Sequence, residues 1–141
     1  MALARRLVAP VVGFLVATAT SFAEAPPMPS ARDKAEPFLA SVAVGDGDSA
    51  LDALVKGSLL ETQPKQLEVL KTQIRAGIKL YGKYIGIELI EEKTIGKSVV
   101  SLTYLMKFEQ NPLVWNFVFY RPLDQWQVSW VMFNDRFQGL N

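Results

Sequence analysis

The spacing of apolar positions changes once along the chain, near Tyr84. Before this residue, apolar side chains recur every three or four positions, and after it they alternate with polar ones. The first spacing places apolar side chains on one face of an α-helix, whereas alternation places them on one face of a strand. The sequence therefore predicts helices followed by antiparallel strands, which is an α+β fold.

Three helices are predicted before Tyr84. The first begins at Glu36-Pro37, because proline is favoured in the first helical turn, and it ends at Gly45. The second follows a turn over residues 46–49, in which Asp48 or Ser49 caps the helix. The third begins near Pro64 and carries the clearest amphipathic stripe, formed by Leu67, Leu70, Ile74, Ile78 and Tyr81.

Four strands are predicted after the helices, over residues 84–93, 100–108, 113–121 and 126–133. The last two form a hairpin whose register follows from placing Arg121 opposite Trp126. The remaining pairs on that side of the sheet are then Phe119 with Val128, Phe117 with Trp130, and Trp115 with Met132. This register places one strongly apolar, aromatic face against the helices.

The opposite face of the same hairpin also carries more apolar side chains than is usual for a sheet face exposed to solvent. Contiguous exposed apolar patches on soluble proteins usually mark an interface. We therefore predict a homodimer, or docking of a protein partner, through an outer sheet face formed by Val114, Val118, Tyr120, Val131 and Phe133.

The first 23 residues have the pattern of a secretory signal peptide. Arg5 and Arg6 form a cationic head, an apolar run follows, and Ser21 and Ala23 are the small residues expected before a cleavage site. The apolar run is shorter than the roughly 20 residues of a membrane span. We expect cleavage after Ala23, no membrane span in the mature chain, and a periplasmic or secreted location. Residues 24–33 then form a proline-rich leader, residues 34–137 the domain, and residues 138–141 a tail.

Composition excludes several classes of function. The chain has no Cys and no His, which removes catalysis by Ser-His-Asp or Cys-His pairs, zinc sites built on these side chains, and thiol redox chemistry. The formal net charge is +1 and no basic cluster stands out, so nucleic-acid binding is not expected. The acidic residues 46, 48 and 52 lack the spacing of a calcium loop. No cofactor and no metal site are predicted.

The arrangement resembles the nuclear-transport-factor-two-like superfamily, which includes the SnoaL-like polyketide cyclases and ketosteroid-isomerase-like proteins. The resemblance rests on Phe38-Leu39 with Gly45-Asp46 ending the first helix, on the long third helix, and on Trp126-Gln-Val-Ser-Trp130 in the last strand. It covers roughly residues 34–137. It implies three helices packed on a curved four-stranded antiparallel sheet, wrapped into a cone-shaped α+β barrel whose mouth often holds a ligand.

The resemblance implies a pocket in the cone lined by Tyr81, Tyr104, Trp115, Phe117 and Trp130. The function we expect is that of an exported, non-catalytic domain that binds a small apolar ligand or a protein partner. One alternative is a cofactor-independent acid–base enzyme, an isomerase, dehydratase or cyclase, working in the cone. No residue of this chain matches the catalytic motif of the ketosteroid-isomerase-like proteins, and Glu88 and Glu109 are expected to face water. A second alternative is a structural assembly subunit.

Overall fold

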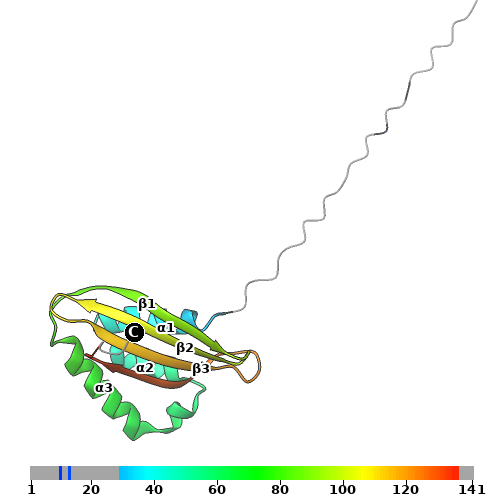
Figure 1. The fold of residues 1–141 in the computed structure, drawn as a ribbon. Coiled ribbons are helices and arrows are strands. Elements are labelled where there is room, and N and C mark those ends of the chain that lie inside the picture. The colour runs from blue at the N-terminus through cyan, green and yellow to red at the C-terminus, as the bar shows by residue number, and fades with distance from the viewer. Residues whose placement is uncertain (1–9, 11–12, 14–28, 137–141) are drawn as a thin grey trace, which may run out of the picture.

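The computed structural model describes residues 29–136 together with Pro10 and Gly13, so the predicted signal peptide, the start of the leader and the tail lie outside the described residues. The helices come first in the chain and the strands follow, which confirms the predicted α+β class (Figure 1). The elements are α1 (Arg32–Ala43), α2 (Gly47–Val55), the 3-10 helix η1 (Leu59–Thr62), α3 (Pro64–Ile78), β1 (Tyr84–Ile95), β2 (Val99–Phe108), β3 (Leu113–Tyr120) and β4 (Gln127–Asn134).

Helix α1 begins about one turn earlier than the sequence predicts. Its start at Arg32 corrects the leader as well, because the residues from Arg32 onward belong to the helix. Ala31 and Ala35 are buried, so the added turn packs on the core. The backbone N–H of Ser30 donates to Asp33 Oδ2 at 2.7 Å, and this hydrogen bond stabilises the N-terminus of the helix. Pro37 therefore lies inside the helix. Its missing N–H leaves without its helical partner only the backbone carbonyl of residue 33, and Asp33 is exposed.

The start of α2 also differs from the prediction. Asp46 occupies the N-cap position, and Asp48 and Ser49 lie inside the helix. The shift follows from close packing, because a Cβ atom at Gly47 would lie only 2.8 Å from Ile74 Cγ2 of α3. Only glycine lets the two helices approach this closely, so the first turn of α2 is fixed there.

The four strands form one antiparallel sheet in the order β1-β2-β3-β4. Helices α1 and α2 lie behind one face of this sheet, and α3 runs past its β4 edge (Figure 1). We call the covered side the inner face. Its largest fully buried side chains come from the central strands β2 and β3, as the alternation predicts: Leu102, Tyr104, Met106, Leu113, Trp115, Phe117 and Phe119. Phe38 of α1 meets Trp115 and Phe117 edge to face, which joins the helices to the sheet.

The register of the last hairpin is correct only near its turn. Phe119 pairs with Val128 as predicted, but Val118 then pairs with Trp130 because Ser129 is an extra residue in β4. A β-bulge of this kind reverses which side every later residue faces. Trp130 therefore lies on the uncovered side, where it is 46% exposed, and the prediction that it faces the helices is wrong.

The same bulge corrects two predicted members of the outer face. Val131 pairs with Phe117, Phe133 pairs with Trp115, and both therefore point to the inner face. Val131 belongs to the buried core, and the ring of Phe133 stacks on that of Trp115 with 4.6 Å between centroids. Val131 is thus a core residue and Phe133 packs partly buried against the core, and neither belongs to the outer face.

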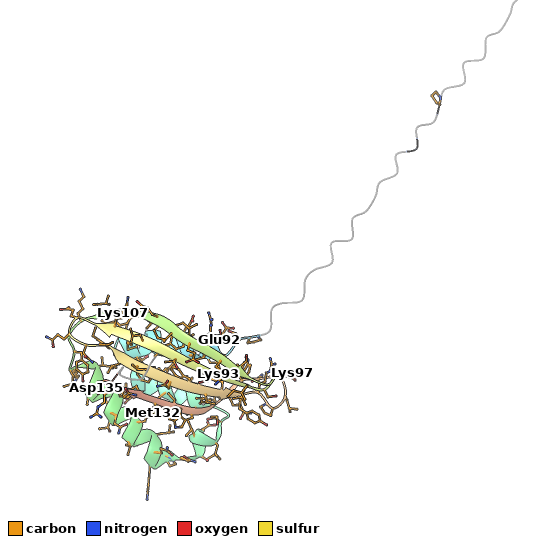
Figure 2. The ribbon with its side chains drawn as sticks, in the orientation of Figure 1. Glu92, Lys93, Lys97, Lys107, Met132 and Asp135 are labelled. Carbon is orange, nitrogen blue, oxygen red and sulfur yellow. The ribbon has the colours of Figure 1, made fainter. Side chains whose placement is uncertain are left out.

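The uncovered side of the sheet, which we call the outer face, is divided by charge. Charged side chains occur along β1 and β2, among them Lys93 and Lys107 (Figure 2). Lys107 forms an ion pair of 2.8 Å with Glu88. Among the described residues, the outer positions of β3 and β4 hold no charged side chain; they are Val114, Asn116, Val118, Tyr120, Gln127, Trp130, Met132 and Asn134. Glu88 and Glu109 are exposed, as the alternation predicts.

Candidate ligand groove

A groove of about 440 Å³ separates the second half of α3 from the end of β4. Apolar side chains supply most of its wall. Three polar residues, Tyr81, Asn134 and Asp135, lie at the helix exit and the strand end, and Gln73 lies midway along α3. The residues that line it are Leu70, Gln73, Ala76, Gly77, Leu80, Tyr81, Leu113, Met132, Phe133, Asn134 and Asp135. Met132 and Asp135 lie on the side of the sheet nearest α3 (Figure 2).

Within the groove, α3 comes close to β4 at Gly77. A Cβ atom at Gly77 would lie 2.9 Å from Phe133 Cε2, so glycine at this position allows the helix to rest on the aromatic ring. On either side of this contact, Leu80 of the helix exit is 64% exposed and Met132 of the strand is 41% exposed. The ring of Phe133 lines the bottom of the groove and is held in position by stacking on the buried ring of Trp115.

The polar end of the groove is built by Tyr81 and Asp135. The Tyr81 hydroxyl donates a hydrogen bond of 2.6 Å to Asp135 Oδ2, and the Asn111 side chain donates to the Asp135 carbonyl oxygen at 3.3 Å. The hydrogen bond to Asp135 raises the pKa of Tyr81, with smaller contributions from burial and from the negative charge. Tyr81 is therefore a protonated donor near neutral pH, and its proton is already engaged.

Four of the five residues predicted to line a pocket do not line this groove. Tyr81 does line it, but Tyr104, Trp115 and Phe117 are packed into the core with relative exposures of 1% or less. Their rings meet one another and Phe38, so aromatic packing fills the space. Trp130 lies on the outer face for the reason given above.

A polar cluster joins the start of α1 to the sheet near Tyr104. The buried Tyr104 hydroxyl donates to Glu36 Oε1 at 3.0 Å, and Arg32 forms an ion pair with Glu92 of β1. Burial raises the pKa of Tyr104, and the hydrogen bond to Glu36 raises it further. Glu36 is exposed, whereas Tyr104 is 1% exposed with its ring edge to face against Phe117, so this cluster holds α1 in place and offers no room for a substrate.

Replacing Tyr104 with Phe is expected to flatten the loss of stability at alkaline pH. The pKa of Tyr104 lies above its ordinary value of 10.0 in the folded protein, so the unfolded chain gives up this proton first. The stabilisation is complete below about pH 10 and falls as pH rises toward the folded pKa. Urea unfolding from about pH 8 to about pH 11 should show a steeper decline for the wild type. Parallel declines would contradict the assignment.

Of the five residues predicted to form an interface, three occupy outer positions of the sheet and two occupy inner positions. Val118 and Tyr120 remain on the outer face, half-buried and 45% exposed respectively. Val114 occupies an outer position but is only 2% exposed. Val131 lies in the core and Phe133 packs partly buried against it, and their places on the outer face are taken by Trp130 and Met132.

Comparisons with family models, with curated proteins and with solved structures found no match to this chain. Within the described part of the chain, no helix is long and apolar enough to cross a membrane. The described residues also contain no group of three or more Asp or Glu side chains placed to hold a metal ion. The groove and the outer face are therefore the features from which a function is inferred.

Sequence reasoning missed most of the groove. Leu70 and Tyr81 carried a signal, because both belong to the helical stripe, yet they are only half-buried. Exposed apolar residues such as Leu80 and Met132 gave no sign that they lie across a gap from each other. Asp135 follows the last strand, and only the fold brings it within hydrogen-bond distance of Tyr81.

Proposed function

We propose that this chain is an exported, non-catalytic domain that binds a small apolar ligand in the groove between α3 and β4. The observation that carries this proposal is the groove itself, whose volume of about 440 Å³ lies within the range of known ligand pockets. A mostly apolar wall with a few polar groups is the usual lining of such sites. Export is proposed on the pattern of residues 1–23 alone.

The proposal retains a relationship to the nuclear-transport-factor-two-like superfamily and its curved, cone-shaped sheet. The order of elements supports it, because three helices precede a four-stranded meander. The proposed ligand site differs from the one that this relationship led us to expect. It lies beside the edge strand β4, whereas the aromatic residues of the central strands are packed together.

Catalysis is the less supported reading of the same groove. An acid–base enzyme needs a group that exchanges protons near neutral pH and reaches the substrate. Tyr81 has a raised pKa and already donates to Asp135, which leaves it unsuited to act as a base. Tyr104 and Glu36 do not line the groove. Asp135, the one carboxylate that does line it, has no acid partner among the lining residues other than Tyr81, whose hydroxyl already donates to it. The proposed role is therefore binding.

A neutral fluorescent probe, N-phenyl-1-naphthylamine, tests the ligand proposal. We expect a saturable rise in its fluorescence with the folded protein, and an affinity about tenfold lower for Ala76→Trp, because the new ring fills the groove. Ala40→Trp is the matched control, since Ala40 is also an exposed helical alanine but does not line the groove. Absence of saturable binding to the wild type, or equal weakening in both variants, would refute the proposal.

Self-association through the outer face is a second proposed role, supported by a separate observation. Tyr120, Trp130 and Met132 are each more than 40% exposed around the half-buried Val118. Large apolar side chains gathered on one uncharged surface are typical of an interface. A second copy of the chain fits this surface, because an uncharged patch meets its own copy without like-charge repulsion.

Trp130→Glu is expected to convert a dimer into a monomer in sedimentation experiments. Two carboxylates would face each other across a symmetric contact, and Trp130 is the largest exposed side chain of this surface. Leu123→Glu serves as the control, since Leu123 is 84% exposed in the loop between β3 and β4 and lies off the outer face. A wild type that stays monomeric at high concentration would rule out this role.

A further inference from the structure

Asp135 gives the groove a negative charge that no lining cation offsets. Of the eleven residues that line the groove, Asp135 and Tyr81 are the only ionisable ones, and Tyr81 is protonated. Lys79 and Arg136 are neighbours of lining residues in sequence, but both are exposed and neither lines the groove. A ligand in the groove therefore meets one carboxylate and otherwise neutral groups.

The end of α3 adds to this negative character. The helix ends at Ile78, and Gly77, Leu80 and Tyr81 of its last turn and exit line the groove. Backbone carbonyls at the C-terminus of a helix carry a partial negative charge, which favours cations within the last turn. This effect is independent of Asp135, and both act at the same end of the groove.

The carboxylate of Asp135 is held in place without being neutralised. The Tyr81 hydroxyl and the Asn111 side chain anchor its side chain and its backbone, and both are neutral donors. An ionised carboxylate has about four lone-pair sites, so one hydrogen bond from Tyr81 leaves acceptor capacity for a ligand. A fixed carboxylate beside the aromatic rings of Tyr81 and Phe133 has the chemistry that recognises ammonium groups.

We propose that the ligand of this groove is a cationic amphiphile, with an apolar body along α3 and β4 and an amine or quaternary ammonium at Asp135. The inference rests on the proposed function, because it specifies the ligand of the same site. Leu70, Leu113 and Phe133 contact the apolar body, and Asp135 with the end of α3 holds the charged end. Anionic amphiphiles with an apolar body of equal length should bind more weakly, because the carboxylate of Asp135 repels their charge.

Three compounds with the same alkyl chain test this inference: octylamine, octanol and octanoate, each used to displace N-phenyl-1-naphthylamine at neutral pH and low salt. We expect octylamine to bind about fivefold more tightly than octanol, which corresponds to an exposed ion pair. Octanoate should bind more weakly than octanol. Added salt should reduce the advantage of octylamine, because exposed charges are screened.

The variant Asp135→Asn tests whether the tighter binding of octylamine than of octanol depends on the carboxylate of Asp135. The amide keeps an acceptor for the Tyr81 hydroxyl, so the groove retains its shape while the charge is removed. We expect octylamine to bind the variant only as well as octanol does. Asp124→Asn removes one exposed carboxylate from the loop between β3 and β4, which does not line the groove, and should leave the order unchanged.

The outcomes separate this inference from the proposed function. Equal binding of the three compounds, preference for octanoate, or an amine preference that persists in Asp135→Asn would overturn the inference while leaving a binding groove. A probe that binds and is displaced by none of the three would also overturn it. A probe that does not bind would refute the proposed function, and the inference with it.

Discussion

Replacing Phe117 with alanine is expected to lower the free energy of unfolding by about 3–5 kcal/mol. The side chain is fully buried and contacts the rings of Phe38, Tyr104, Trp115 and Phe119, so truncation removes apolar burial and leaves a cavity. Urea denaturation followed by circular dichroism measures the change. The loss should appear as a lower midpoint with an unchanged slope.

Trp130→Ala is the matched control for this result. Both residues are large aromatics, and the sequence pattern places them opposite each other on the inner face. The structure places Trp130 on the outer face with 46% of its surface exposed, so its loss should cost less than about 1 kcal/mol in the dissociated protein. Equal losses for Phe117 and Trp130 would show that the two residues share the core, and the bulge in β4 would then be wrong.

The parts of the fold that the sequence predicted are those governed by local periodicity. The stripe from Leu67 to Ile78 gave α3, and alternation gave β2 and β3, because side-chain direction repeats every 3.6 or every two residues. Gly45, with a φ of +89°, ends α1 where the sequence placed the end. These features need no knowledge of distant contacts.

The parts that sequence analysis missed depend on contacts between elements. Ser129 looks like any other strand residue, and only pairing with β3 reveals that it is extra. The first turn of α1 has a proline one turn later, and burial of Ala31 and Ala35 outweighs that signal. The start of α2 was likewise set by the approach of Gly47 to Ile74 rather than by a capping side chain.

The candidate site divides in the same way. Tyr81 extends the stripe of α3, and it does line the groove. Alternation predicts that Tyr104, Trp115 and Phe117 lie on the inner face, which is correct, but a sheet face becomes core wherever helices cover it. The groove lies between the second half of α3 and the end of β4, and periodicity carries no information about such a gap.

Val131→Glu is expected to be the most damaging single change in β4, with a loss of about 3–5 kcal/mol. Val131 is 8% exposed among core residues that offer no partner for a carboxylate, whereas its neighbour Met132 is 41% exposed. Met132→Glu should therefore fold with nearly wild-type stability, measured by thermal unfolding at low protein concentration. The two substituted positions are adjacent, so the comparison tests which side of the sheet each side chain faces after the bulge at Ser129. If Met132→Glu were the destabilising change, β4 would run without its bulge, and the outer face and the groove would both lose Met132.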